Sequence, residues 1–174
     1  MKYHLLFHAF QTIVFHLEKI TFQKDSKLTR NKSNAFSFTS INSITIPKNV
    51  KIIGKSAFFF CEKLKTIKFE EDSKLEIIKK DAFIYSLIDS IVIPSSVKKI
   101  EVSAFEHNNF LKSIEFFSDE IHFENRCFSL CPKLFLISFH NAKKIRFTKY
   151  SFFKSDCELS IFACPIKKGM EFGY

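Results

Sequence analysis

Large apolar residues recur along this 174-residue chain as pairs separated by one residue, at an almost constant interval. Measured between the first members of successive pairs, the steps are 24, 23, 24, 23, 23 and 24 residues. The seven pairs are Ile20/Phe22, Ile44/Ile46, Ile67/Phe69, Ile91/Ile93, Ile114/Phe116, Ile137/Phe139 and Ile161/Ala163. A period of roughly 20 to 50 residues is the sequence signature of a stacked repeat. The pattern therefore predicts a solenoid in which each repeat forms one rung.

Two further apolar positions repeat with these pairs. An aliphatic residue stands three positions before each of the first six pairs, and a Phe preceded by a small residue stands eight or nine positions before each pair from the second onward. These Phe residues are Phe36, Phe58, Phe83, Phe105, Phe128 and Phe152. Because one aromatic recurs in each rung, we expect the rings to stack in the interior of the solenoid.

The Leu-x-x-Ile-x-Ile segment of each repeat has the alternation of a strand with one buried face. We therefore predict a strand-dominated α/β repeat of about six to seven rungs, in which these strands form a parallel sheet on the concave face. Short apolar runs such as 50–53, 75–78 and 97–100 predict a second strand in each rung, and the small-Phe pair predicts a helical turn or a tight corner. The expected organisation is a partial repeat or cap at 1–19, the array at 20–163 and a tail at 164–174.

The best-formed repeats resemble a known family. Residues 44–67 and 91–105 combine an Ile-Pro strand end with an Ala-Phe corner, and the first also has an Ile-Gly step at Gly54 and a Cys before the next Leu at Cys61. This combination resembles the BspA-like leucine-rich repeats. The resemblance implies a leucine-rich-repeat solenoid and, by the roles proposed for surface-antigen-like members in protist parasites and host-associated bacteria, protein binding or adhesion. In other repeats the glycine of the family pattern is replaced by Lys79, Glu101, Glu124 and Thr148. The cysteine of the pattern is replaced by Tyr85, Asn108 and Ser155.

The sequence contains few candidates for catalysis or for metal binding. Only three glycines are present, which excludes the Gly-rich loops that hold phosphates. The histidines at 4, 8 and 16 lack the further ligand that zinc requires, and Glu70/Glu71 and Asp119/Glu120 are interpreted as solvated loop charges. An odd count of five cysteines favours buried free thiols over a disulfide framework. We therefore expect no enzyme activity, no cofactor, no metal and no small-molecule substrate.

Charge and the chain ends leave the compartment open. The net charge is +9, which favours attraction to polyanions, but no nucleic-acid-binding module accompanies it and specific nucleic-acid binding is disfavoured.

Met1 to Lys19 is interpreted as a partial rung, with a secretory signal as the alternative. No apolar stretch is long enough to predict a transmembrane segment. The resemblance implies a cell-surface or secreted protein, a cytoplasmic location remains open, and Asn31 begins a glycosylation sequon.

The outward-pointing residues of the predicted strands are the candidate contact surface for a protein ligand. They are Thr45, Lys68, Val92, Glu115, Phe117, Ser138 and Phe162. The leading hypothesis is a non-catalytic protein-interaction module of the surface or adhesion type. The alternatives are an intracellular basic repeat scaffold that binds polyanionic partners and a degenerate fragment with no independent role.

Overall fold

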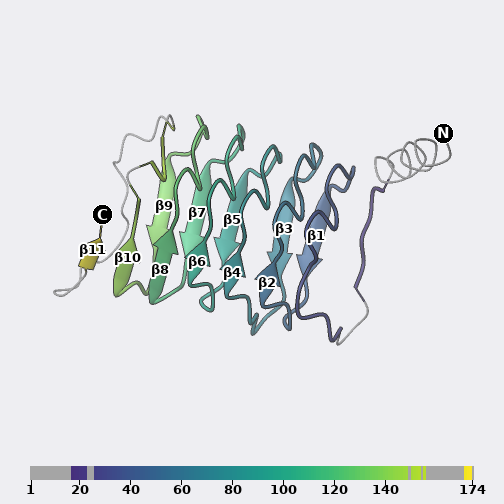
Figure 1. Cartoon of the computed structure of the whole chain (residues 1–174), viewed down its shortest axis with the longest axis horizontal. Coiled ribbons are helices and arrows are strands. Elements are labelled where there is room, and N and C mark those ends of the chain that lie inside the picture. The colour runs from purple at the N-terminus through teal and green to yellow at the C-terminus, as the bar shows by residue number, and fades with distance from the viewer. Residues whose placement is uncertain (1–16, 23–25, 149, 154, 156–170, 174) are drawn as a thin grey trace.

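Two rows of parallel strands run along a solenoid in the computed structural model, which describes residues 17–22, 26–148, 150–153, 155 and 171–173 (Figure 1). The odd-strand row consists of β1 (Ser43–Ile46), β3 (Thr66–Phe69), β5 (Ser90–Ile93), β7 (Ser113–Phe116) and β9 (Leu136–Phe139). The even-strand row consists of β2 (Ile52–Ile53), β4 (Ile77–Ile78), β6 (Lys99–Ile100), β8 (Glu120–Phe123), β10 (Lys144–Arg146) and β11 (Glu171–Gly173). This arrangement confirms the predicted leucine-rich-repeat solenoid with two strands in each turn.

The two rows differ in continuity. The even strands form one six-stranded parallel sheet in the order β11-β10-β8-β6-β4-β2. The odd strands form two separate sheets, β1-β3 and β5-β7-β9, although β3 and β5 are neighbours along the solenoid (Figure 1). Within each sheet the repeated apolar pairs are in register, as Ile44 opposite Ile67 and Ile91 opposite Ile114 show. The repeat period therefore sets the register, and one junction of the odd-strand row departs from it.

The interior is built around a column of stacked Phe rings, as the sequence predicts. The centroids of successive rings are 5.1 to 5.5 Å apart, and the angles between their planes range from 4° to 24°. The column contains Phe36, Phe58, Phe83, Phe105, Phe128 and Phe152. The inward Ile residues of both rows pack around it, because alternate side chains of a strand point to the same face. No turn of the array could bury these side chains alone, so stability comes from contacts between rungs.

The corners are tight turns, and the described residues contain no α-helix. Each corner holds two residues with a left-handed backbone four positions apart, for example Ser56 and Phe60, both with φ between 50° and 60°. A left-handed backbone costs a non-glycine residue about 1–2 kcal/mol. Both N–H groups donate to carbonyl oxygens of the next rung, Ser56 to Lys80 and Phe60 to Ile84, each at 2.9 Å. These hydrogen bonds between rungs offset the conformational cost.

The number of rungs is smaller than predicted. The described residues contain five odd strands, whereas the sequence predicts about six to seven rungs. Ile20 and Phe22 are half-buried and pack against the core but do not form a strand. The last predicted pair, Ile161/Ala163, lies outside the described residues, as do residues 1–16 and most of the predicted tail.

Gly54 is required by a close approach between rungs. A Cβ at this position would lie 2.3 Å from the carbonyl oxygen of Asn31. The later rungs carry Lys79, Glu101 and Glu124 at the equivalent position, so the requirement is specific to the rung beside Asn31. The side chain of Asn31 is itself buried, with 3% of the residue exposed. A glycan on this sequon does not fit the folded rung.

Truncation of a ring in the Phe column should cost much more stability than truncation of a corner ring. The ring centroid of Phe83 lies 5.1 Å from those of Phe58 and Phe105, and the residue is fully buried. Phe83→Ala should therefore lower the free energy of unfolding by about 3–5 kcal/mol. Phe59 is half-buried at a corner, and Phe59→Ala should cost less than about 2 kcal/mol. Urea denaturation followed by circular dichroism measures both. Equal losses would contradict the assignment of the column.

Candidate functional site

The interruption of the odd-strand row coincides with two changes of segment length. Ile44 and Ile53 are nine residues apart, whereas the corresponding Ile67 and Ile78 are eleven apart. The extra residues lie in the segment that follows β3. The corner that leads into β5 is also one residue shorter than those that lead into β3, β7 and β9, because Ile88 stands five positions after Phe83 in place of six; the corner into β1 is equally short, since Ile41 stands five positions after Phe36. The two added residues after β3 are therefore the length change that distinguishes this junction from the paired junction of β1 and β3.

Pro94 removes one of the hydrogen bonds that would join β3 to β5. At the equivalent position of two other rungs the backbone N–H donates to the last residue of the preceding odd strand, as Glu70 does to Ile46 at 3.0 Å and His140 does to Phe116 at 2.9 Å. Proline has no N–H, so Pro94 cannot donate to the carbonyl of Phe69. The even strands of the same rungs remain paired, with Ile77 opposite Lys99.

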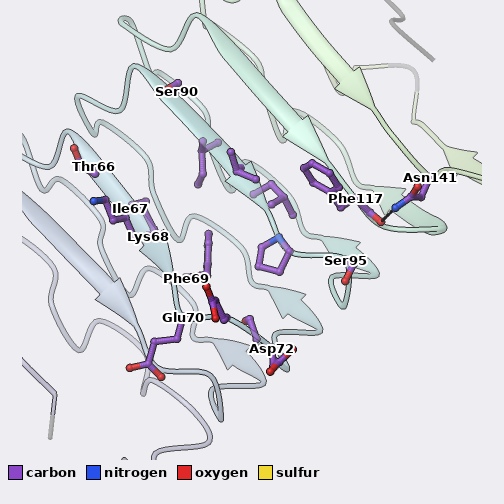
Figure 2. A pocket seen from close by; sticks show the side chains of 16 residues that line it. Thr66, Ile67, Lys68, Phe69, Glu70, Asp72, Ser90, Ser95, Phe117 and Asn141 are labelled. Carbon is purple, nitrogen blue, oxygen red and sulfur yellow. Dashed lines mark hydrogen bonds between the residues drawn. The ribbon is translucent and has the colours of Figure 1, made fainter. Parts of the chain in front are cut away.

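A groove of about 870 Å³ lies over this interruption (Figure 2). Its lining comes from β3, β5, the segment 70–73 and two residues beyond the neighbouring strands, Phe117 and Asn141. Val92, one of the lining residues, is 52% exposed, and the half-buried Phe69 and Pro94 extend the apolar surface. The volume is in the range of pockets that hold ligands.

A set of contacts holds Phe117 at the far edge of the groove. The ring of Phe117 stacks on His140, with centroids 4.3 Å apart and an angle of 12° between the planes. Asn141 Nδ2 donates to the carbonyl oxygen of Phe117 at 3.4 Å, as Figure 2 shows. His140 Nε2 in turn lies 3.0 Å from Glu115 Oε2. The aromatic edge is therefore fixed by side chains from β7 and the residues after β9.

Three consecutive carboxylates form the opposite rim. Glu70, Glu71 and Asp72 are exposed and follow directly after β3. Glu70 Oε2 accepts a hydrogen bond from the backbone N–H of Lys48 at 2.9 Å, which fixes that side chain. Asp72 has φ of 55°, a backbone conformation that Asp tolerates better than most residues. Within the described part of the chain, neither Glu71 nor Asp72 forms an ion pair.

The structure gathers some of the predicted contact residues and separates others. Lys68, Val92 and Phe117 line the groove. Thr45 lies opposite Lys68 on β1 and Glu115 opposite Val92 on β7, both outside the lining. The other two are Ser138 and Phe162.

Ser138 was expected to be exposed, but it is 7% exposed because its short side chain lies opposite the longer Glu115. Phe162 lies outside the described residues. The sequence reading missed the role of Glu70, Glu71 and Asp72 as a rim. The signal that could have identified them is the two-residue increase between Ile67 and Ile78.

A second hollow, of about 170 Å³, lies on the even-strand row. It is lined by Lys98, Glu120, Ile121, His122, Lys144 and Arg146. Arg146 lies opposite His122 in the sheet, and Lys144 lies opposite Glu120. Cationic side chains therefore outnumber the single carboxylate of Glu120 around this hollow.

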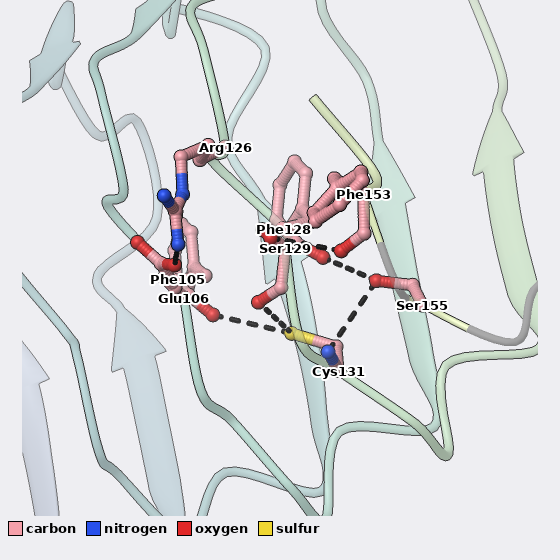
Figure 3. A network of polar contacts seen from close by, with 8 residues as sticks. All are labelled: Phe105, Glu106, Arg126, Phe128, Ser129, Cys131, Phe153 and Ser155. Carbon is pink, nitrogen blue, oxygen red and sulfur yellow. Dashed lines mark hydrogen bonds and ion pairs between the residues drawn. The ribbon is translucent and has the colours of Figure 1, made fainter. Parts of the chain in front are cut away.

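The cysteines occupy structural positions. Three residues after a ring of the Phe column, a polar side chain donates to the carbonyl of the column Phe in the preceding rung. These bonds are Cys61 Sγ to Phe36 at 3.0 Å, Asn108 Nδ2 to Phe83 at 2.8 Å, Cys131 Sγ to Phe105 at 3.2 Å and Ser155 Oγ to Phe128 at 2.6 Å. Figure 3 shows the last two of them. The sequence pattern assigned Tyr85 to this position in the rung of Phe83. The residue three positions after Phe83 is Ser86, because the corner before Ile88 is one residue short. Ser86 Oγ is buried without a hydrogen-bond partner among the described residues, so this rung again departs from the others.

The buried carboxylate of Glu106 is also explained by contacts between rungs. Glu106 is 5% exposed and forms an ion pair with Arg126 in the next rung (Figure 3). Arg126 Nε donates to Glu106 Oε1 at 3.0 Å. A buried charge with such a partner has a structural role that needs no ligand.

The described residues contain neither a cluster of three or more His, Cys, Asp or Glu that could hold a metal nor a helix suited to cross a membrane. The predicted histidines at 4, 8 and 16 lie outside the described residues. Cys61 and Cys127 are free thiols, and both they and Cys131 are buried. Burial raises the pKa of Cys61 and of Cys127 above the usual range of a thiol, against the opposing effect of hydrogen bonds to Thr39 and Ser151.

The three buried thiols should resist modification until the chain unfolds. A raised pKa leaves little thiolate at Cys61 and Cys127 at pH 8, and burial blocks access of the reagent to all three thiols. In a Cys157→Ser/Cys164→Ser background, we expect 5,5′-dithiobis(2-nitrobenzoic acid) to react slowly with the native protein and with three thiols after denaturation. Rapid reaction of the native protein would contradict this assignment of the cysteines.

The repeats match a known family model and are similar to several solved structures. A family model described as a BspA type leucine rich repeat region, in six copies, matches residues 29–160. Similar solved structures include the pneumococcal vaccine antigen PcpA, with a TM-score of 0.41 and 16% identity over 76% of this chain and 63% of that chain. A leucine-rich repeat protein from Bacteroides ovatus has a TM-score of 0.39 and 19% identity over 70% of this chain and 43% of that chain.

A leucine rich cell surface protein from Faecalibacterium prausnitzii has a TM-score of 0.39 and 16% identity over 72% of this chain and 47% of that chain. The chain therefore spans less than two thirds of the length of these structures. No curated protein matches the sequence.

Proposed function

Because this chain belongs to the BspA-type leucine-rich repeat family, we propose that it is a non-catalytic interaction protein of the cell surface that binds a protein partner through its odd-strand row. The observation that carries the proposal is the groove over β3 and β5. Three residues expected from the sequence to contact a partner, Lys68, Val92 and Phe117, line it together.

The composition of the groove supports binding of a protein. Exposed apolar surface at Val92, Phe69 and Phe117 lies within a polar border that includes Lys68 and the carboxylates after β3. An apolar centre within a polar rim is the usual anatomy of a protein interface.

The surface role can be tested on the cells that make the protein. A photo-crosslinking amino acid at Val92 should give discrete adducts on intact cells, because this side chain is exposed in the groove. The same amino acid at Ile77, which lies half-buried on the even-strand row, serves as the matched control and should not give these adducts. Protease applied to intact cells should remove the protein. Protection from protease would contradict the surface location, and adducts at Ile77 alone would contradict the odd-strand face.

The cationic hollow on the even-strand row favours a second candidate function, that of a basic scaffold inside the cell for polyanionic partners. Lys98, His122, Lys144 and Arg146 gather around it, and the chain carries a net charge of +9. A clustered basic surface attracts polyanions through charge alone.

Under this second function, binding of a sulfated heparin oligosaccharide should weaken steeply as salt increases. Lys98→Ala/Arg146→Ala should lower the affinity and reduce the slope of log K against log salt by about one for each contact removed. Lys63→Ala/Lys65→Ala removes the same charge from exposed positions elsewhere and should leave the slope closer to that of the native protein. Equal effects of the two double variants would show that only net charge matters and would contradict a site at the hollow.

A further inference from the structure

We propose that the groove over β3 and β5 binds an extended peptide segment of the partner in which Lys or Arg side chains stand next to large apolar ones. This inference rests on the proposed function and specifies the partner. It is supported by three independent features of the groove: its apolar floor, its acidic rim and the unjoined strand edges beneath it.

The apolar floor selects for large apolar side chains. Val92, which lines the groove, is more than half exposed, and the half-buried Phe69, Pro94 and Phe117 also line it. Burial of apolar area contributes about 25 cal/mol per Å², so contact with this floor supplies affinity. The stacking of Phe117 on His140 holds that ring in place before a ligand arrives, which lowers the entropy cost of binding.

The acidic rim selects for cationic side chains. Glu70, Glu71 and Asp72 are three consecutive, exposed acidic residues in the lining of the groove, in a chain whose net charge is +9. A basic segment is repelled by most of this basic surface and attracted to the rim, so charge directs it to the groove. Each exposed ion pair is worth only about 0.2–1 kcal/mol, so the rim contributes specificity and orientation more than affinity.

The interruption of the odd-strand row favours an extended ligand. No ladder joins β3 to β5 in the described structure, so each strand has an edge that lacks its usual partner. An extended peptide presents backbone donors and acceptors at the spacing of such edges, whereas a folded surface does not. The other described junctions of the odd-strand row, β1-β3, β5-β7 and β7-β9, are paired, so this opportunity is specific to the groove.

Selection from a random display library of twelve-residue peptides on the folded chain tests the proposal, because it assumes no partner. The rim variant Glu71→Gln/Asp72→Asn removes two charges, and Asn tolerates the left-handed backbone at position 72. The floor variant Val92→Ser changes an exposed side chain, so folding should be preserved. Glu62→Gln/Glu76→Gln removes the same charge as the rim variant at exposed positions outside the groove and is the matched control.

Enriched peptides should combine Lys or Arg with large apolar residues. The best of them, made synthetically, should bind the rim variant several-fold more weakly and the Val92→Ser variant about tenfold more weakly, with the control variant unchanged. The inference is overturned by no enrichment, by enrichment of acidic or wholly polar peptides, or by equal binding to the rim variant and the control. Dimerisation of the chain through the groove, detected by light scattering and abolished by Val92→Ser, would also overturn it.

The crosslinking experiment at Val92 separates this inference from the proposed function. Adducts on cells together with a failed library selection would retain the interaction role and reject the basic, apolar peptide as its ligand. Absence of adducts at Val92 would reject the proposed function itself, whatever peptides the library yields.

Discussion

The structure depends on keeping successive turns of the chain one strand apart. Paired strands lie about 4.7–4.9 Å apart, and the rings of the Phe column follow at 5.1 to 5.5 Å. At the corners, the left-handed residues donate backbone hydrogen bonds from one turn to the next. Because ring stacking and backbone pairing need the same spacing, a side chain at a repeated position meets its counterpart in the next turn. The period of 23 or 24 residues is the length of chain that completes one turn and brings each repeated position next to its counterpart.

Much of the fold could be predicted because the same weak signal is repeated in every turn. The Ile-x-Ile pairs and the Phe column appear in the structure as the sequence indicates, since each register is supported by several copies. Local detail was harder to predict. The left-handed corner residues include Phe60 and Leu130, so the usual glycine cue is absent. The sequence placed Tyr85 in the interior because counting assumed a corner of standard length.

The groove could be predicted only in part. Lys68 and Val92 follow from strand alternation alone, so their outward orientation was predictable. The groove itself lies where extra length after β3, a short corner before β5 and Pro94 occur together in the odd-strand row. None of these changes breaks the apolar period, so the pattern that identified the fold concealed them. For the same reason Glu70 and Glu71 were interpreted as ordinary solvated loop charges.

The two residues added between Ile67 and Ile78 leave the even-strand row paired and the Phe column stacked. A solenoid of this kind therefore absorbs an insertion within a single turn, because each turn depends only on its neighbours. Divergence of such proteins can proceed by short insertions and deletions on one side, with the opposite side serving as an invariant frame. New recognition surfaces can then evolve one turn at a time without a new fold.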